Sequence, residues 1–570
     1  MHQPELLDAA VVRAWVRTTV DALAAARAEL DRVNVFPVAD GDTGTNMYLT
    51  ARDAAAAVHA APGDAGGARL LRLAARAALL GARGNSGVIL SEWLRGLTVA
   101  ATRGDSLAIA LDVAARSARQ AVAHPAPGTI LTAAESAAAA ARQVEAGGMV
   151  GPPGAPARLS TVDAACRGAR EAALRSVGAL EPLRVAGVLD AGACGLVLVL
   201  ESLAAAQRGA DGPTSEAGGS MAPVLLDMDL RGHGDPAPAT PAPDPDEAWA
   251  GDVGSRGDAY GEAFGEAHRD GATDDVELMF VLERSASAAG FRPGAVADAL
   301  RADLDDVGSS VVVVGGGDEG DAPERSLWQA HVHTSDLDAA LGVARRWASR
   351  GAVSRVSVRH LAVPPDRWAV VVTTAAPALA AELARGGAVV VLDLDVRPTA
   401  ADLAAAALGA GAPRVLVLAP GALLDGLDGG AAAGAERSAE VPEIVRVAAP
   451  ADVHLVAGTS ALAAALDAAR EEDVDVPAVV GSVVAGLRVG TGPAVTVGAI
   501  VKRLVAGSPV AIVTLLPDDD VPDATMTVLA ARAAEVSGGA DVVVMRTGRP
   551  GGRVAIGVEP LVPDTAGAPR

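Results

Sequence analysis

The chain has 570 residues, a formal net charge of -23, and 50% hydrophobic but only 2% aromatic side chains. This length predicts roughly three to four domains, whose cores must be built from Ala, Val and Leu. The absence of clustered Lys and Arg argues against nucleic acid as a partner. Two cysteines, Cys166 and Cys194, make no disulfide framework. The sequence shows neither a signal-peptide pattern nor the apolar stretch of a membrane span, so we expect a cytoplasmic protein.

The N-terminal part, residues 1–206, is predicted to be an all-α helical bundle or barrel. In its first helix Leu7, Val11 and Trp15 recur at the four-residue spacing of one helix face. Further helical runs occupy residues 69–80, 86–101, 106–123, 129–145, 159–174 and 193–207. Glycine-rich joints separate these runs, so the unusual residues of the domain lie in its loops.

Three regions of different composition follow the helical domain. Residues 207–261 are rich in Pro, Asp and Gly without periodicity, which predicts a disordered linker. Residues 262–362 alternate as strand, helix, two strands, helix and strand, the order of an α+β ferredoxin-like split βαβ unit. Residues 363–570 alternate Val-rich strands with helices, which predicts an α/β domain with a mainly parallel sheet.

Chemistry-bearing residues are concentrated in residues 34–47, NVFPVADGDTGTNM. Asp40 and Asp42 flank a glycine, and magnesium is usually held by one or two carboxylates together with substrate phosphates. The apolar run from Met47 indicates a helix start, whose N–H groups bind phosphate oxygens. We therefore predict a site for ATP and magnesium, and a kinase. The alternative is a polar turn that caps the helix.

Three more glycine-containing joints precede helices in this domain. Residues 81–91, GARGNSGVILS, offer a second anion site, unless they are a simple helix-to-helix turn capped by Asn85 or Ser86. The other two joints are residues 127–129, PGT, and residues 190–192, DAG. A plain helical bundle needs only short polar loops, so the four joints together favour a binding site.

The lysine content restricts how such a site can work. Lys502 is the sole lysine of the chain, so the helical domain contains no phosphate-binding loop of the G-x-x-x-x-G-K-[ST] type. The Gly-rich loop and strand lysine of protein kinases are missing as well. Metal ions and backbone amides must therefore neutralise most of the phosphate charge.

Four stretches of the helical domain resemble the signature stretches of the DhaL-type kinase domain: residues 34–47, 81–96, 127–132 and 189–201. That domain occurs in the ATP-binding subunit of dihydroxyacetone kinase and in the catalytic subunit of bacterial fatty acid kinase. NVFPVADGDTGTNM and ARGNSGVILSEWLRG are similar to the fatty acid kinase form, and the order of the remaining domains fits that subunit.

The resemblance implies a role for each matching residue. Asp40 and Asp42 would bind two magnesium ions that bridge the ATP phosphates. Dihydroxyacetone kinase has a third aspartate a few residues earlier, where this chain has none; Asn34 lies near that place and would supply its amide oxygen. The residues that would contact phosphate or ribose, or line the nucleotide pocket, are Gly44, Thr45, Asn46, Ser86, Gly87, Thr129, Asp190 and Gly192.

The resemblance also implies an acceptor and partners. A separate fatty-acid-binding protein would present a fatty acid, and the C-terminal domain would engage that partner; a homodimer is expected too. A carboxylate acceptor is already ionised near neutral pH and needs no general base. Two alternatives stay open: a dihydroxyacetone (glycerone) kinase-type subunit, which would need an outside substrate-holding domain, and a non-catalytic nucleotide-binding scaffold.

A second candidate metal site lies in the middle region. His331 and His333 are two residues apart in a predicted strand, so both side chains point to the same face, where they could bind zinc. The fatty acid kinase subunit carries a matching His-x-His together with a cysteine on the first strand of this domain. Glu277 stands at the place of that cysteine here and would complete the zinc site. The alternative is a partly exposed strand face.

Overall fold

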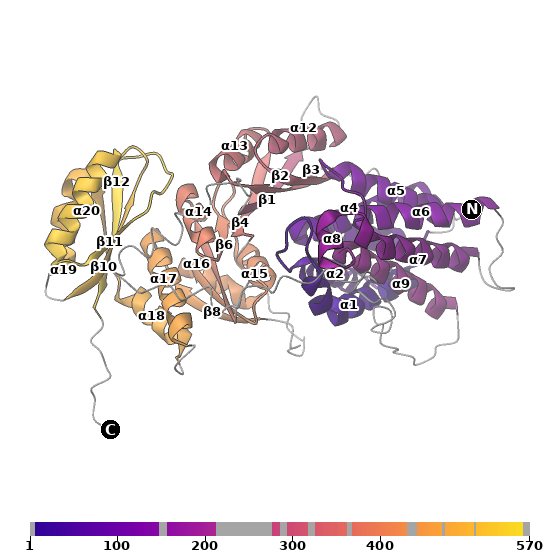
Figure 1. Cartoon of the computed structure of the whole chain (residues 1–570), viewed down its shortest axis with the longest axis horizontal. Helices are drawn as coiled ribbons and strands as arrows, with labels where there is room; N and C mark the ends of the chain where they lie inside the picture. Colours follow the sequence, from indigo (N-terminus) through magenta and orange to yellow (C-terminus); the bar gives the residue numbers. More distant parts are fainter. Residues whose placement is uncertain are drawn as a thin grey trace, which may run out of the picture. The chain divides into compact units, whose positions relative to one another are not determined.

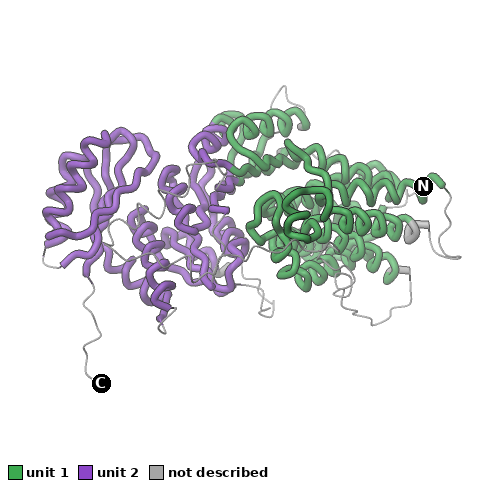
Figure 2. Tube along the Cα trace, in the orientation of Figure 1, with its two compact units in different colours: residues 1–251, 279–333, 346–353 green, residues 252–278, 334–345, 354–570 purple. Residues whose placement is uncertain are grey.

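The computed structural model describes nine segments of the chain: residues 6–147, 157–211, 276–285, 293–316, 325–361, 367–429, 442–469, 474–506 and 509–561. Two compact units are present, coloured in Figure 2. Unit 1 comprises residues 1–251, 279–333 and 346–353, and unit 2 comprises residues 252–278, 334–345 and 354–570. Residues 207–211 of the predicted linker end a helix, and residues 212–261 lie outside the described segments.

The N-terminal part of unit 1 is helical, as predicted (Figure 1). Its helices are α1 (Ala9–Arg32), α2 (Thr43–Ala60), α3 (Gly67–Gly81), α4 (Gly84–Arg103), α5 (Leu107–Ala121), α6 (Ile130–Gly147), α7 (Ala157–Arg175), α8 (Glu181–Ala186) and α9 (Ala191–Asp211). From α1 to α7 each helix packs on the one after it, α7 packs on α9, and α9 packs on α1. The helices therefore form a closed ring, and short connections make neighbouring helices run in opposite directions.

Small residues and two tryptophans hold the ring together. A Cβ at Gly96 of α4 would lie 2.5 Å from Cα of Ala114 on α5, so the two backbones approach closely there. Trp15 of α1 and Trp93 of α4 meet edge to face with ring centroids 6.4 Å apart. The Trp15 indole N–H donates to the carbonyl of Val199 on α9 at 2.9 Å. An alanine-rich sequence thus still gives a close-packed core.

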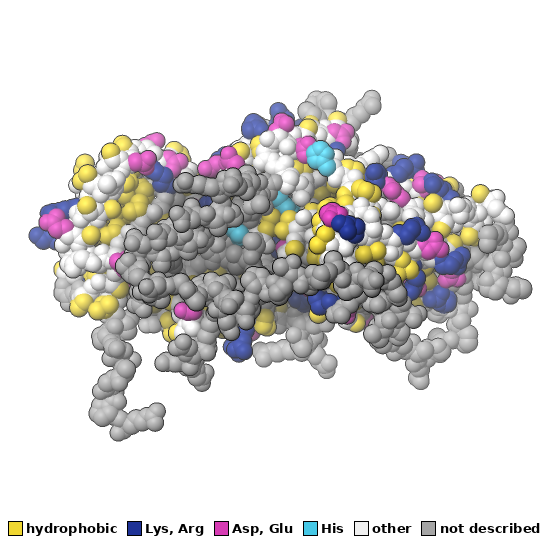
Figure 3. Space-filling view, in the orientation of Figure 1, with side chains coloured by type: hydrophobic (Ala, Val, Ile, Leu, Met, Phe, Trp, Pro, Cys, Tyr) yellow, Lys and Arg dark blue, Asp and Glu magenta, His cyan; other side chains and the backbone are white. Residues whose placement is uncertain are grey.

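The long apolar helix α9 belongs to this core. Its segment Ala191–Gly209 is the one helix, among the residues described here, that is long and apolar enough to cross a membrane. Packing inside the helical domain buries 83% of that segment, which accounts for its composition. On the face of the molecule shown in Figure 3, basic and acidic side chains are intermixed over the helical part.

The middle region has the predicted element order: β1 (Val276–Ser285), α12 (Pro293–Asp305), β2 (Ser309–Gly316), β3 (Arg325–Thr334), α13 (Leu337–Ala348) and β4 (Ala352–His360). Its strands lie in the order β2-β3-β1-β4, which is the order of a split βαβ unit. Strands β2 and β3 are antiparallel, with Val312 opposite His331.

Within unit 1, one face of β1, β2 and β3 packs on the helical ring. Met279, Val281, Val312 and Leu327 belong to the same buried apolar cluster as the helices. Val122, after α5, forms an antiparallel bridge with Val312. We expected separate domains here, but these strands and the ring share one core.

The C-terminal region contains two kinds of sheet. Strands β6 (Ala388–Leu392), β5 (Trp368–Thr374), β7 (Arg414–Ala419) and β8 (Glu443–Ala448) extend the order above to an eight-stranded sheet, and the pairs β5-β6, β5-β7 and β7-β8 are parallel, as predicted. The helices that follow these strands are α14 (Pro377–Arg385), α15 (Ala400–Gly409), α16 (Gly421–Leu424), α17 (Asp452–Ala468) and α18 (Val476–Gly486).

The last part of the chain differs from the prediction of a mainly parallel sheet. A separate four-stranded sheet has the order β11-β10-β12-β9, in which only β10-β11 is parallel, while β10-β12 and β12-β9 are antiparallel. Its elements are β9 (Arg488–Pro493), α19 (Val497–Val505), β10 (Val510–Pro517), α20 (Asp523–Ser537), β11 (Asp541–Val544) and β12 (Arg553–Pro560). The Val-rich runs predict that strands form here, but strand direction depends on connections that the runs do not encode.

Candidate functional site

Several helix N-termini meet at one end of the helical ring. Because neighbouring helices alternate in direction, α2, α4, α6 and α9 all begin at the same end. A Cβ on Gly84, the first residue of α4, would overlap the amide of Asn46 in the first turn of α2. A Cβ on Gly195, one turn into α9, would overlap the sulfur of Met47 on α2. The N-terminal ends of these helices carry positive potential and suit an anionic ligand.

Asp190 joins the start of α6 to the start of α9. Its carboxylate accepts hydrogen bonds from the backbone N–H groups of Ala193, at 2.7 Å, and of Ile130. A Cβ on Gly192 would lie 3.3 Å from Cβ of Ile130, so the two helix starts pack closely. Burial raises the pKa of Asp190 to about 7, against the lowering effect of the two N–H groups. This carboxyl therefore changes charge near neutral pH.

Thr129 completes the group at α6 and α9. It directly precedes α6, is buried, and donates its hydroxyl to the carbonyl of Ala126 at 3.0 Å. The predicted nucleotide-pocket residues Thr129, Asp190 and Gly192 thus lie together, next to the starts of α2 and α4.

Asp40 and Asp42, the two aspartates predicted to bind magnesium, stand just before α2. Asn34 donates from Nδ2 to Oδ1 of Asp40 at 2.5 Å, and its Oδ1 accepts from the Thr43 hydroxyl at 2.9 Å. Asp42 accepts at 2.7 Å from Nδ2 of Asn46. Asp42 occupies the N-cap position of α2, but its side chain makes no capping bond, so a side-chain cap by Asp42 is wrong. Each carboxylate is instead oriented by an asparagine amide.

The start of α4 lies against these residues. Its N-cap is Arg83, so the alternative of a cap by Asn85 or Ser86 is also wrong. Ser86 lies in the first turn with its Oγ 3.2 Å from Oγ1 of Thr43. A Cβ on Gly87 would lie 3.2 Å from a backbone carbonyl oxygen of α2, which shows how closely the two helices approach.

Arg83 is largely buried although it lies at a helix end. Its side chain is only 14% exposed and forms an ion pair with Asp53 at 3.4 Å. It also donates to the carbonyl of Gly81 at 2.5 Å. Arg83 therefore fixes the joint between α3 and α4.

The C-terminal end of α1 supports the first turn of α2. The Thr45 hydroxyl donates to Asp31 at 2.7 Å, the Thr45 backbone N–H donates to Asp31 at 2.9 Å, and Nε of Arg27 donates to the same hydroxyl at 2.9 Å. A Cβ on Gly44 would lie 2.8 Å from a side chain of α1. Burial raises the pKa of Asp31, and the charge of Asp42 raises it further. Thr45 is thus held by α1, and in this arrangement its donors face Asp31.

Sequence reasoning missed Asp31 and Arg27. They are four residues apart on a helix, which is the ordinary spacing of a solvated surface pair. Their function as supports becomes visible only when α2 packs on α1, since Thr45 is far from them along the chain.

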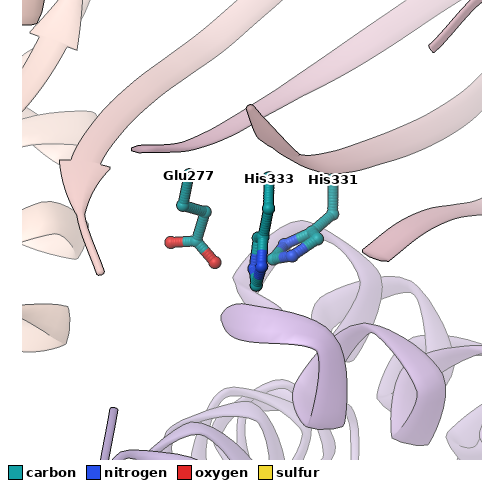
Figure 4. Close-up of side chains that lie close together, drawn as sticks. All are labelled: Glu277, His331 and His333. Carbon is teal, nitrogen blue, oxygen red and sulfur yellow. The ribbon is translucent and has the colours of Figure 1, made fainter. Parts of the chain in front are cut away.

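Glu277, His331 and His333 gather on one face of the β1–β3 strands (Figure 4). One ligand atom of each lies within 4.8 Å of the others, and all three residues are buried, so the alternative of a partly exposed strand face is wrong. The donor types suit zinc. However, the Arg359 guanidinium donates to both carboxylate oxygens of Glu277, through Nε and, at 3.3 Å, through Nη2. A metal ion at this place would compete with a cation for that carboxylate.

Two family models match this chain. Residues 37–205 match the DAK2 domain, and residues 276–363 match the FakA-like middle domain of fatty acid kinase. The chain therefore carries a DAK2 domain followed by a FakA-like middle domain. The predicted resemblance to a DhaL-type kinase, and to the catalytic component of fatty acid kinase among these, is confirmed.

Curated relatives match part of this chain. Protein YloV of Bacillus subtilis is 35% identical over 210 residues, which cover 36% of this chain and 36% of the relative. The uncharacterized protein SH1689 of Staphylococcus haemolyticus is 34% identical over 195 residues, covering 33% of each chain. The matched part thus spans about a third of the length of these relatives. A crystal structure of the dihydroxyacetone kinase of C. freundii shares 22% identity over 36% of this chain and 35% of its own, with a TM-score of 0.27, too low to establish a common fold.

Proposed function

We propose that this chain is the catalytic component of an ATP- and magnesium-dependent kinase that phosphorylates the carboxylate of a fatty acid. The observation that carries the proposal is the meeting of the N-termini of α2 and α4 beside Asp40 and Asp42, with the α6 and α9 starts next to them. Helix N-termini bind phosphate, and carboxylates bind the magnesium that accompanies it.

The residues divide the work as follows. Asp40 and Asp42 hold two magnesium ions, which supply positive charge to the ATP phosphates. The amide nitrogen of Asn34 orients Asp40, while its Oδ1 accepts from Thr43 and keeps a second lone pair for the predicted role as a metal ligand. The backbone N–H groups of Gly44 and Ser86, in the first turns of α2 and α4, contact the phosphates. The N–H groups of Asn46 and Gly87 donate to the carbonyls of Asp42 and Arg83 at 2.8 and 3.1 Å, so these two residues act through their packing at the helix starts.

A carboxylate acceptor suits a site of this kind. An ionised carboxylate oxygen attacks the γ-phosphorus, the bond from that phosphorus to the β-phosphate oxygen breaks, and ADP and an acyl phosphate form. No proton has to be removed from the acceptor, so no general base is required. A separate fatty-acid-binding protein presents the fatty acid, as the resemblance to the fatty acid kinase family implies. Cytoplasmic location and a homodimer stay predictions.

The test is to mix the chain with ATP, magnesium and a fatty acid on its binding protein, and to trap acyl phosphate as the hydroxamate with hydroxylamine. Asp40→Asn and Asp42→Asn should each lower the rate by at least about a hundredfold, since each removes a metal-binding charge. Asp21→Asn is the matched control, because Asp21 is an exposed carboxylate on α1. Full activity in both site variants would overturn the proposal.

The match to the DAK2 domain also favours a second candidate, a phosphotransferase of the dihydroxyacetone kinase type. The same assay separates the two when dihydroxyacetone and a substrate-holding protein replace the fatty acid and its carrier. Transfer to the ketone alone would support this candidate. ATP binding with no transfer to either acceptor would favour a non-catalytic scaffold.

For the middle domain we propose zinc binding by Glu277, His331 and His333. The proximity and burial of the three donors support it, while the ion pair of Glu277 with Arg359 opposes it. Metal analysis of the purified full-length chain after dialysis against trace zinc tests the proposal. About one zinc per chain, lost in His331→Ala, is expected; a metal-free wild-type protein would contradict it.

A further inference from the structure

We propose that the middle domain is a positioning element of the nucleotide site, acting through Gln329 of β3 and Glu92 of α4. Both contacts lie inside unit 1, where β2 and β3 pack on the helical ring. The inference rests on the proposed function only in that the positioned loop is the predicted phosphate-binding joint between α3 and α4.

Gln329 contacts the joint at its first residue. Its side chain is only 5% exposed, and Nε2 donates to the backbone carbonyl of Ala82 at 3.0 Å. Ala82 is the C-cap of α3 and immediately precedes Arg83, the N-cap of α4. The Gln329 amide therefore holds the point at which the chain turns into the phosphate-binding helix.

The carbonyl oxygen of the Gln329 amide indicates that this residue positions the joint rather than stabilises the fold. Oε1 of Gln329 is buried and has no hydrogen-bond partner among the described residues. A buried polar atom without a partner costs stability, and leucine would remove that cost. Leucine would also leave the buried carbonyl of Ala82 without its donor, so the two effects offset and the stability should change little. The benefit of glutamine here is the single bond to Ala82.

Glu92 provides a second attachment, two turns into α4. Its carboxylate accepts from the backbone N–H of Gly315 on β2 at 3.1 Å, from the Ser117 hydroxyl at 2.5 Å, and from Arg95 at 2.6 Å. Only 4% of Glu92 is exposed, so its charge serves these structural contacts. Strands of the middle domain thus contact the chain at two points, at Ala82 just before α4 and at Glu92 within it.

A short path connects the first attachment to the metal-binding acids. Past Ala82, Gly84 packs on the amide of Asn46, which donates to Asp42. In the same turn the Ser86 hydroxyl lies 3.2 Å from the Thr43 hydroxyl. The Thr43 hydroxyl donates to Asn34, and the Asn34 amide donates to Asp40. We infer that a displacement of the joint reaches both carboxylates through one packing contact and the hydrogen bonds that follow it.

The test uses the full-length chain and Gln329→Leu, with Trp328→Phe as the matched control. Trp328 is the neighbouring buried residue on the opposite face of β3, and its Nε1 also has no partner among the described residues, so removing that atom breaks no bond. Hydrogen–deuterium exchange of peptides covering residues 81–90 reports the joint without any nucleotide. Titration with ATP and magnesium reports the site.

For Gln329→Leu we expect a melting temperature that changes little, because relief of the unpaired Oε1 and loss of the Ala82 partner offset each other. Exchange of residues 81–90 should be about fivefold faster and ATP binding about fivefold weaker, since one hydrogen bond is lost. Trp328→Phe should leave the exchange of residues 81–90 and ATP binding unchanged. Unchanged exchange in Gln329→Leu would overturn the inference. If the wild-type chain binds no ATP, the proposed function fails, and the exchange experiment alone still decides whether Gln329 positions the joint. Should Gln329→Leu not fold, Gln329→Met, of similar length, gives the same comparison.

Discussion

Replacing Gly84 by alanine should damage both the fold and the nucleotide site. Gly84 begins α4 with a φ of 53°, in the left-handed region that favours glycine. A Cβ there would lie 3.0 Å from Cγ of Asn46 and overlap its amide nitrogen. That nitrogen donates to Asp42 at 2.7 Å, so the Asn46 side chain cannot move aside without breaking its bond to a predicted magnesium ligand.

Gly187→Ala separates the cost of a left-handed backbone from the cost of the overlap with Asn46. Gly187 has a similar φ of 64°, but a Cβ there would meet nothing within 4 Å. Its replacement should cost only the left-handed conformation, about 1–2 kcal/mol. Gly84→Ala should cost that amount plus about 1–3 kcal/mol for overpacking. Loss of the Asn46 bond to a charged partner, roughly 1.5–3 kcal/mol, should weaken binding of magnesium-ATP about tenfold or more.

Urea unfolding followed by circular dichroism measures the stabilities, and calorimetric titration measures binding of magnesium-ATP. Gly187→Ala should bind as well as the wild-type protein. The reasoning would be refuted if Gly84→Ala were no less stable than Gly187→Ala, or if it bound ATP with wild-type affinity. Either result would mean that Asn46 is not held against Gly84 and Asp42.

Other predictions concern two buried carboxyls. Burial raises the pKa of Asp190 from 3.8 to about 7, so the folded chain keeps this proton to higher pH than the unfolded chain; the stability from this group is present below about pH 4 and lost as the pH rises through about 7. Between roughly pH 5 and pH 8 the free energy of unfolding should fall by about 2–3 kcal/mol through this group. Urea unfolding of Asp190→Asn should show no such fall. If the free energy of unfolding fell equally in the wild-type protein and the variant, the raised pKa of Asp190 would be contradicted. In Arg359→Met, the buried Glu277 loses its ion pair, which should destabilise the protein by about 3–5 kcal/mol. Added zinc should restore the melting temperature of Arg359→Met if the three donors bind it, and no effect of zinc would speak against the metal site.

Local patterns were sufficient to predict most elements. The helix starts at the four joints, the strand order of the middle region and the parallel pairs of the first sheet all follow from periodicity, glycine position and short connections. The meeting of the four joints also has a simple cause, because alternate helices of an antiparallel ring begin at one end. The sequence pattern did not predict that α9 packs on α1 and closes the ring.

Contacts between distant parts of the chain could not be predicted. Asp31 looks like an ordinary helix-surface residue until Thr45 is folded against it. Gln329 looks like a polar residue in a strand until Ala82 is beside it. The mixed direction of the last sheet depends on how β9 and β12 return to β10, which the Val-rich runs do not specify. Long-range packing, rather than local propensity, decides each of these features.

Isotope transfer from the acceptor tests the central claim most directly. The chain, ATP and magnesium are incubated with a fatty acid whose carboxylate carries oxygen-18, held on its binding protein, and hydroxylamine then releases phosphate from any acyl phosphate. Because the carboxylate oxygen becomes the bridge to phosphorus, phosphorus NMR should show one oxygen-18 in the released phosphate, and Asp42→Asn should abolish that signal. Phosphate without the label would show transfer to water, and would contradict a fatty acid carboxylate as the acceptor.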